Sequence, residues 1–379
     1  MELKIAFSLR CFLNVGERGL TTIVLISTYL VQLQFMIHNV AGHTTLHIRN
    51  ISSTDSPPSA DIILTDLFPK TTFHRSLYAL WSPNHAEVSK DELTVKLKLD
   101  YFSGCAIKSI EKYYHGFFSA AIKLPGNYSA GVVTTFYMSN NEAFPKNHDE
   151  FDFEFLGTIP GEPYTVQTNI YGNGGTHIGR EQRFRLWFDP TENFHNYSFL
   201  WTANHTVFFV DNIPIWEFPR LASMGAQYPS KQMSLYATIW DASRWATDGG
   251  LYKVNYDYQP FIATYSNIIL SGCPNFNPSK SPVDSCPPIY NEPIPPGLTR
   301  QQLHALHWVQ QNHRFYSYCT DLKRYPDIAD IPECAAERAQ NMHVGHGHSQ
   351  MHSTEHTTTT APFRPGKVTK IEPAPVEGH

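Results

Sequence analysis

The sequence predicts an all-β protein, a sandwich or jelly roll, with a small C-terminal extension that contains a helix. From about residue 87 to 270, short strand-like segments follow one another with frequent turns, and no long helical pattern interrupts them. Aromatic residues make up 13% of the chain, and aromatic side chains favour pleated, half-buried surfaces. At 379 residues, the chain is long enough for one large β domain with a small appendage.

Individual strands show the two-residue period of a half-buried sheet. Between residues 93 and 99, Leu and Val alternate with Thr and Lys. Apolar runs at 207–210 and 213–218 flank the turn dipeptide Asp211-Asn212, which predicts a hairpin. Further strands are predicted at 233–240 and 261–270.

The pattern changes after residue 270. Residues 273–296 are rich in Pro, Ser and Asn and predict an irregular connection. A helix follows, with Thr299 as its cap and Gln302 completing a capping box. We expect its apolar stripe to consist of Leu303, Leu306 and Val309. After Cys334 the sequence becomes a His-rich tail of low complexity, for which we expect disorder, with metal binding as the alternative.

The cysteines favour local disulfides. Four of the six stand late in the chain as two close pairs, which predicts Cys273–Cys286 and Cys319–Cys334 with Cys105 free. Buried free thiols are the alternative, and zinc is disfavoured because the chain has no CxxC unit.

The N-terminus predicts export. Arg18 precedes an apolar stretch from residue 20 to 40, which is typical of a signal peptide with a long leader or, alternatively, of an uncleaved membrane anchor. The sequence carries four glycosylation tripeptides, at Asn50, Asn127, Asn196 and Asn204. Asn196 and Asn204 are expected to flank one exposed turn, which makes them the better candidates.

The run from His148 to Phe155 carries the chemistry. On a strand, Glu150, Asp152 and Glu154 point to one face, and the three intervening Phe residues point to the other, into the core. Like charges on one strand face are destabilising, so a purely structural strand has little reason to hold them. Three interpretations remain open from the residues alone: a solvated acidic strand, a divalent-cation site, or glycoside hydrolysis by two carboxylates.

Geometry favours the third interpretation. Residues four apart on a strand have Cα atoms roughly 13 Å apart. Two glutamates that lean toward each other can approach the separation of about 5–5.5 Å that suits a retaining double displacement. Asp152 lies between them, where it can hold Glu150 by a hydrogen bond and help to keep one neighbour protonated.

The run HDEFDFEFLG resembles the HDE-x-D-x-EFLG signature of plant xyloglucan endotransglucosylase/hydrolases, in glycoside hydrolase family 16. Further blocks along residues 60 to 335 are similar to that family, among them Gln167-Thr-Asn, Arg180-Glu-Gln, Trp245-Ala-Thr and the segment from Tyr318 to Cys334. The resemblance implies a curved, concanavalin-like β-jelly roll with an open cleft for a polysaccharide.

By motif position, the resemblance implies that Glu150 is the nucleophile, Glu154 the general acid/base and Asp152 their helper. It also implies a set of sugar contacts, which are Gln167, Thr168, Asn169, Gly179, Arg180, Glu181, Arg244, Trp245, Gly249 and Arg324. The segment around Arg244 departs from the family pattern, which often has an acidic pair before the Trp.

The expected activity is cleavage of the β-1,4-glucan backbone of xyloglucan and its transfer to a second xyloglucan chain. Hydrolysis by the same residues is the alternative, and a non-catalytic glucan-binding protein is disfavoured because both glutamates are present. We expect no cofactor, no metal, no nucleic-acid partner, a monomer, and secretion to the cell wall and apoplast. The expected organisation is a leader at 1–42, a catalytic domain at 43–270, a disulfide-stapled extension at 271–335 and a disordered tail at 336–379.

Overall fold

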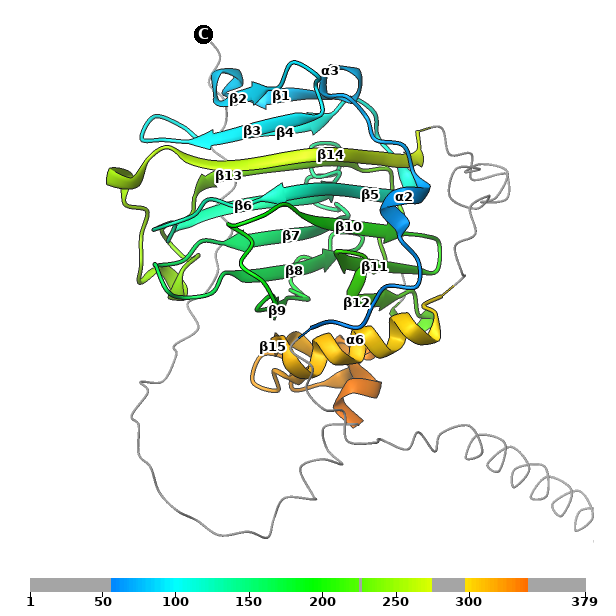
Figure 1. Cartoon of the computed structure of the whole chain (residues 1–379). Coiled ribbons are helices and arrows are strands. Elements are labelled where there is room, and N and C mark those ends of the chain that lie inside the picture. The colour runs from blue at the N-terminus through cyan, green and yellow to red at the C-terminus, as the bar shows by residue number, and fades with distance from the viewer. Residues whose placement is uncertain (1–55, 225–226, 275–296, 340–379) are drawn as a thin grey trace, which may run out of the picture. The chain divides into compact units, whose positions relative to one another are not determined.

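The computed structural model describes residues 56–224, 227–274 and 297–339. Two antiparallel β-sheets form a sandwich, and a helix lies along its lower end (Figure 1). The predicted all-β sandwich with a small C-terminal helix is confirmed. The predicted leader, Asn50, Cys286 and the His-rich tail lie outside the described residues. Among those that are described, no helix is long and apolar enough to cross a membrane.

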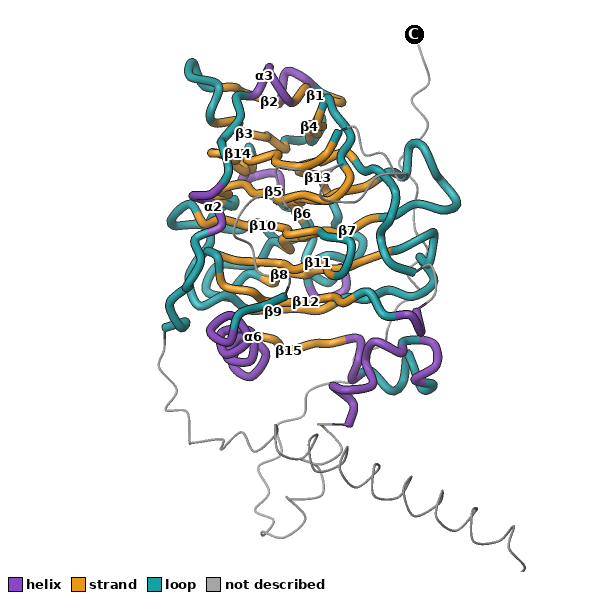
Figure 2. The backbone as a smooth tube through the Cα atoms, turned by 90° about the vertical axis from the view of Figure 1, so that its right-hand side faces the viewer, coloured by secondary structure: helices purple, strands orange, loops and turns teal. Residues whose placement is uncertain are grey.

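Fifteen strands of the described residues make up the two sheets, and Figure 2 shows them from the side of the molecule. The eight-stranded sheet contains, in spatial order, β1 (Leu77–Trp81), β4 (Cys105–Ser109), β13 (Ser234–Asp241), β6 (Val132–Ser139), β7 (Glu150–Leu156), β8 (Thr165–Tyr171), β9 (Gln182–Phe184) and β15 (Arg314–Ser317). The seven-stranded sheet contains β12 (Ile213–Pro219), β11 (His205–Val210), β10 (His195–Trp201), β5 (Tyr114–Lys123), β14 (Phe261–Cys273), β3 (Thr94–Leu99) and β2 (Ala86–Val88).

In the part of the chain that the structure describes, the helical elements other than the 13-residue α6 are short. With α6 included, they are α2 (Leu64–Leu67), α3 (Phe73–Ser76), α6 (Arg300–Asn312) and the 3-10 turns η1 (Pro83–His85), η2 (Ala222–Met224), η3 (Asp248–Gly250), η4 (Tyr256–Tyr258), η5 (Tyr318–Thr320), η6 (Ile328–Asp330) and η7 (Pro332–Cys334).

The strands predicted from periodicity are present. In β3, the apolar residues Val95, Leu97 and Leu99 are buried, and the alternating polar residues are not. The hairpin of β11 and β12 turns at Asp211 and Asn212, whose φ angles are 50° and 62°. Two consecutive positive φ angles suit a two-residue hairpin, and Asn and Asp tolerate that backbone conformation better than other residues with a side chain.

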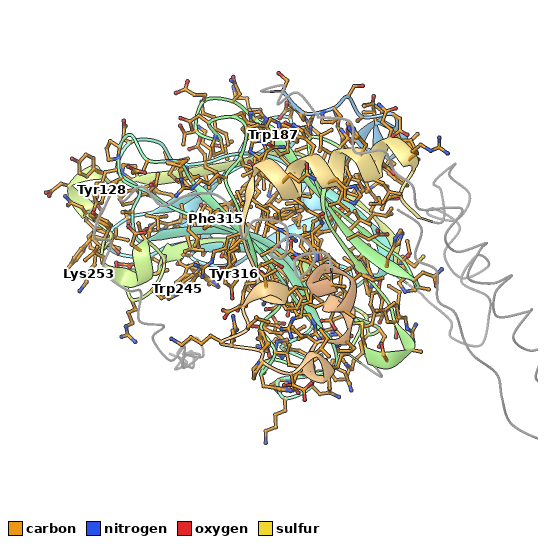
Figure 3. All side chains as sticks on the ribbon, turned by 90° about the horizontal axis from the view of Figure 1, so that it is seen from below. Tyr128, Trp187, Trp245, Lys253, Phe315 and Tyr316 are labelled. Atoms are coloured by element: carbon orange, nitrogen blue, oxygen red, sulfur yellow. A yellow bond between two sulfur atoms is a disulfide. The ribbon has the colours of Figure 1, made fainter. Side chains whose placement is uncertain are left out.

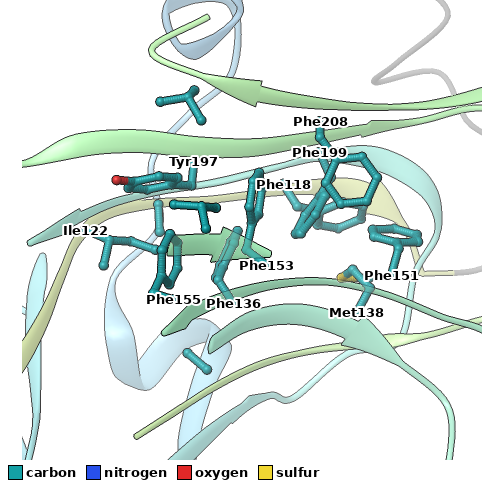
Figure 4. Packing of buried hydrophobic residues seen from close by; sticks show 14 of the residues in the cluster. Phe118, Ile122, Phe136, Met138, Phe151, Phe153, Phe155, Tyr197, Phe199 and Phe208 are labelled. Carbon is teal, nitrogen blue, oxygen red and sulfur yellow. The ribbon is translucent and has the colours of Figure 1, made fainter. Parts of the chain in front are cut away.

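The core between the sheets is built largely from aromatic rings. Phe151, Phe153 and Phe155 of β7 are fully buried, as predicted, and they meet rings of β10 in the opposite sheet (Figure 4). Phe153 and Phe151 each lie 4.9 Å from Phe199, and Phe155 lies 4.6 Å from Tyr197, between ring centroids. Since burying one such side chain is worth about 1.5–3 kcal/mol, this packing fixes which face of β7 turns outward.

Helix α6 begins as predicted but buries a different face. Thr299 and Gln302 form the capping box. Leu303, expected in the apolar stripe, is 40% exposed, so that part of the prediction is wrong. The buried face is formed instead by Gln302, Ala305, Leu306, Trp308 and Val309. Trp308 packs 5.4 Å from Trp187, labelled beside the helix in Figure 3, and burying this large ring sets the helix rotation.

The cysteine predictions have two outcomes. Cys319 and Cys334 form a disulfide, and Cys105 is free and buried, both as predicted. Burial raises the pKa of the Cys105 thiol to about 11, so it is unreactive at neutral pH. The Cys273–Cys286 bridge stays a prediction, because Cys286 lies outside the described residues.

The two glycosylation candidates do not flank one turn. Asn204 is exposed in the turn between β10 and β11. Asn196 lies at the other end of β10, beside the Asp211-Asn212 turn, where its backbone oxygen accepts a hydrogen bond from Asp211.

Candidate active site

Strand β7 carries the acidic residues on the outer face of the eight-stranded sheet. It lies between β6 and β8, with Glu150 paired to Ser139 and Tyr171, and Glu154 paired to Thr135 and Gln167. Because side chains alternate along a strand, the buried Phe residues force Glu150, Asp152 and Glu154 onto the opposite face. The predicted arrangement of the two faces is therefore confirmed.

Asp149 fixes the segment that leads into this strand. Its buried carboxylate accepts hydrogen bonds from the backbone nitrogens of Asn173, Ser230 and Lys231, at 2.6, 2.7 and 2.8 Å. The Lys231 ammonium adds an ion pair at 2.9 Å. A fully buried carboxylate with this many donors is well compensated, so Asp149 anchors the start of β7 rather than reacting.

Glu150 receives its hydrogen bond from a neighbouring strand. The Ser139 hydroxyl on β6 donates to Glu150 Oε2 at 2.9 Å, and His148 Nε2 lies 3.9 Å from the same oxygen. The hydrogen bond predicted from Asp152 to Glu150 stays a prediction, and the sequence pattern gave no sign of the Ser139 contact. Asp152 itself is nearly buried on the same face, between the two glutamates, and pairs with Tyr137 and Asn169.

Glu154 has a different environment. Gln167 on β8 donates from Nε2 to Glu154 Oε2 at 2.6 Å. Burial raises the pKa of Glu154 to about 7; the Gln167 hydrogen bond opposes that rise, and the nearby charges of Glu150 and Glu181 add to it. A carboxyl with a pKa near neutrality can both give and take a proton at physiological pH, which is what a general acid/base requires.

The predicted sugar contacts on β8 fall on two faces. Gln167 and Asn169 are aligned with Glu154 and Asp152, so they share the outer face with the carboxylates. Thr168 pairs with Phe153, is fully buried and points to the core side. A direct sugar contact from the Thr168 side chain is therefore excluded by the two-residue period of the strand.

The predicted sugar contacts just before β9, at residues 179–181, also lie in different environments. The Glu181 carboxylate forms a two-point ion pair with Arg324, at 2.5 and 3.1 Å, which brings these two residues together near Glu154. The Arg180 side chain is fully buried, with an ion pair to Glu333 at 2.6 Å and its guanidinium 5.4 Å from the Phe218 ring. Arg180 therefore acts as a structural link, which corrects its assignment as a sugar contact. Gly179 accepts from the Tyr325 hydroxyl through its backbone oxygen.

The loop after β13 holds the remaining predicted contacts. Trp245 is half-buried and packs 6.2 Å from Trp240, against a small apolar cluster that includes Leu156. Leu156 is two residues beyond Glu154 on the same face of β7, which places Trp245 along that face. Arg244 and Gly249 are exposed.

Arg183 is a site residue that the sequence did not reveal. Its Nε donates to Gln167 Oε1 at 2.7 Å. It stands two residues after Glu181, and the two-residue period of an extended chain, which places such residues on one side, is the signal that could have indicated it.

Within the described residues, no group of three or more His, Cys, Asp or Glu side chains could hold a metal ion.

The fold and the site together define a class: a β-sandwich enzyme with paired carboxylates of the kind that cleave glycosidic bonds with retention. A profile described as "Glycosyl hydrolases family 16" matches residues 73–258, and one described as "Xyloglucan endo-transglycosylase (XET) C-terminus" matches residues 288–334. The chain belongs to the xyloglucan endotransglucosylase/hydrolase family, within glycosyl hydrolases family 16.

Curated relatives support this membership. "Probable xyloglucan endotransglucosylase/hydrolase protein 28" of Arabidopsis thaliana is 47% identical over 272 residues, which cover 72% of this chain and 81% of that protein. Protein 27 of the same plant is 48% identical over 277 residues, with the same shares covered. "Probable xyloglucan endotransglucosylase/hydrolase 1" of Solanum lycopersicum is 40% identical over 269 residues, which cover 70% of this chain and 88% of that protein.

Solved structures are more distant. A Bacillus licheniformis beta-glucanase is 20% identical with a TM-score of 0.43, and the match covers 53% of this chain and 94% of that one. A prokaryotic beta-1,3-1,4-glucanase (lichenase) from a mouse hindgut metagenome is 20% identical with a TM-score of 0.42, covering 52% and 94%. Similarity at this level adds nothing to the family assignment.

Proposed function

We propose that this protein is a xyloglucan endotransglucosylase that acts by a retaining double displacement, with Glu150 as nucleophile and Glu154 as general acid/base. The observation that carries the proposal is the placement of both glutamates on one outer face, with the pKa of Glu154 raised to about 7. The names of the relatives support xyloglucan as the substrate.

In the first step, a Glu150 oxygen attacks the anomeric carbon of the donor chain. The bond from that carbon to the leaving glucan oxygen breaks, and Glu154 gives its proton to that oxygen. A covalent glycosyl ester on Glu150 results, and Glu154 is left ionised.

In the second step, Glu154 takes the proton from a hydroxyl of a second xyloglucan chain. That oxygen attacks the anomeric carbon, the ester to Glu150 breaks, and the starting state of both carboxyls is restored. Ser139 supports the first step, because its donated hydrogen bond holds Glu150 in one rotamer. Asp152 is proposed as the helper between the two groups.

We further propose that the protein works outside the cell, in the plant cell wall. The Cys319–Cys334 disulfide supports this location, since structural disulfides persist in oxidising compartments. Gln167, Asn169, Glu181, Arg324 and Trp245 are the proposed lining of the sugar-binding face.

The experiment that tests the activity is product analysis on xyloglucan with a labelled xyloglucan oligosaccharide. Incorporation of label into polymer is the expected result and establishes transfer. New reducing ends without incorporation would identify a hydrolase. The absence of both products would overturn the proposal.

A further inference from the structure

A chain of two hydrogen bonds ends on the proposed acid/base. Arg183 Nε lies 2.7 Å from Gln167 Oε1, and Gln167 Nε2 lies 2.6 Å from Glu154 Oε2. The three residues come from adjacent strands, β9, β8 and β7, where Arg183 pairs with Gln167 and Gln167 pairs with Glu154. The strand register therefore builds this line of contacts, independently of any ligand.

The direction of the two bonds is fixed by Arg183. A guanidinium has only donors, so the group that faces Arg183 must be the oxygen of the Gln167 amide. The amide nitrogen then faces Glu154, and it can only donate. Gln167 alone could turn its amide either way, because both ends of an amide form good hydrogen bonds.

The direction decides where Glu154 carries its proton. Oε2 accepts from Gln167, so a protonated Glu154 carries its proton on Oε1, the oxygen that is not engaged by the amide. With the amide reversed, a protonated Glu154 would donate to the Gln167 oxygen, and its proton would be held away from a substrate.

We infer that Arg183 is a positioning residue for the glycosidic reaction: by fixing the orientation of the Gln167 amide, it keeps the proton of Glu154 on Oε1, free for the leaving group. This inference rests on the proposed function, because it takes Glu154 as the general acid.

The C-terminal segment holds Arg183 in place. Tyr316 on β15 pairs with Arg183 across the sheet, and the Arg183 guanidinium lies 5.3 Å from the centre of the Tyr316 ring. The Tyr316 hydroxyl donates to Asp321 at 3.0 Å, which fixes the ring. Figure 3 labels Tyr316 and its neighbour Phe315. A residue far along the chain thereby contributes to the protonation of the catalytic carboxyl.

Other charges act on Glu154 besides this chain of contacts. Glu150 and Glu181 favour the protonated form, and Arg183 favours the ionised form. The titratable and charged groups on the outer face around Glu154 are Glu150 and Asp152 on β7, Tyr137 on β6, Tyr171 on β8, Glu181 and Arg183 at β9, and Arg324 paired to Glu181. Loss of Arg183 therefore removes a positive charge and frees the amide, and both changes favour the protonated carboxyl.

The test compares Arg183→Met and Arg183→Lys with a matched control, Arg185→Met. Arg185 is also an arginine beside a β15 ring, with its guanidinium 5.3 Å from the centre of the Phe315 ring, but it is exposed, and the hydrogen bond to Gln167 comes from Arg183. The measurement is the pH profile of kcat/KM on xyloglucan, together with kcat/KM on an aryl glycoside of a xyloglucan oligosaccharide, whose leaving group needs no acid.

For Arg183→Met we expect kcat/KM on xyloglucan to fall about 10-fold or more, with the alkaline limb moved up by about half a pH unit. The aryl glycoside should be cleaved at close to the wild-type rate. Arg183→Lys, which can still only donate, should recover most of the loss, and Arg185→Met should match wild type.

An unmoved alkaline limb in Arg183→Met, or an equal loss on both substrates, would overturn the inference. So would a Lys variant as impaired as the Met variant. Failure of the wild-type protein to act on either substrate would instead refute the proposed function, so the two failures are distinguishable.

Discussion

Two glutamates four residues apart on one strand acquire different properties from their neighbours. Glu150 accepts a hydrogen bond from a serine hydroxyl on β6, and Glu154 lies against an amide on β8 and takes a raised pKa from burial. The strand period places both on one face, but the adjacent strands give them different hydrogen-bond partners, and burial raises the pKa of Glu154. The different roles proposed for Glu150 and Glu154 therefore depend on their neighbours in the sheet as well as on their positions along β7.

Replacement of each glutamate by glutamine should separate the two roles. Glu150→Gln should abolish transfer and hydrolysis, because an amide cannot form the glycosyl ester, and azide should not restore activity. Glu154→Gln should lower activity on xyloglucan by about 100-fold or more, but azide should rescue an aryl glycoside, since azide attack on the anomeric carbon needs no base. Product analysis by mass spectrometry measures the glycosyl azide. If azide rescued Glu150→Gln and gave a glycosyl azide of the same anomeric configuration as the Glu154→Gln product, the assignment would be contradicted.

The pH dependence should follow Glu154. Glycosylation needs this carboxyl protonated, and its pKa is raised to about 7, so kcat/KM should fall as the pH rises through that value. Initial rates on xyloglucan between pH 5 and pH 9 measure the limb. In Glu154→Gln, the residual kcat/KM should no longer fall at alkaline pH. A fall that persists in this variant would show that another group is the one that titrates.

The sequence predicted the carboxylates and Gln167 but not the contacts of Ser139 and Arg183. Glu150, Asp152 and Glu154 were found because strand alternation acts over consecutive residues. Ser139 and Arg183 were missed because their contacts depend on inter-strand register, which a single sequence does not encode in its local pattern. Thr168 and Arg180 were assigned to sugar binding by motif position, although β8 alternation could have placed Thr168 inward.

At the scale of elements, the C-terminal segment is joined to the sandwich. Helix α6 packs beside β12, and β15 extends the eight-stranded sheet by pairing with β9. These elements of the predicted extension at 271–335 are therefore in direct contact with the two sheets. The sequence showed the capping box and the change in composition, but four-residue β15 has no pattern strong enough to identify it as a strand.

The Cys319–Cys334 disulfide should protect this segment. It closes a loop with a sequence separation of 15, for which the chain-entropy model gives about 3 kcal/mol. In Cys319→Ala/Cys334→Ala, backbone amides of 318–334 should exchange hydrogen faster, and those of β6 and β7 should remain protected. Hydrogen exchange with mass spectrometry measures both regions, and Cys105→Ala, which removes a free thiol, is the control. Equal loss of protection in both regions would show that the segment and the sandwich unfold together.

At the scale of the molecule, residues far apart in the sequence meet through polar contacts, some buried and some exposed. Glu333 reaches Arg180 from η7, and the Tyr318 hydroxyl donates to the same Glu333 oxygen at 3.1 Å. Thr299, at the start of α6, donates to Asp61 at 2.6 Å. The Arg180–Glu333 contact joins the C-terminal segment to the sandwich just before β9, the strand that carries Arg183.

The Arg180–Glu333 pair gives the sharpest test of this connection. Both side chains are almost fully buried, at 0% and 3% exposed, so Glu333→Gln leaves a buried guanidinium without its counter-charge. Loss of one partner from such a pair costs about 3–5 kcal/mol, and we expect that destabilisation in denaturant unfolding. The matched control is Glu337→Gln, which removes the partner of Arg314 from a more exposed ion pair and should cost about 0–1 kcal/mol. A similar small change in both variants would show that Gln227 and the Phe218 ring hold Arg180 without Glu333.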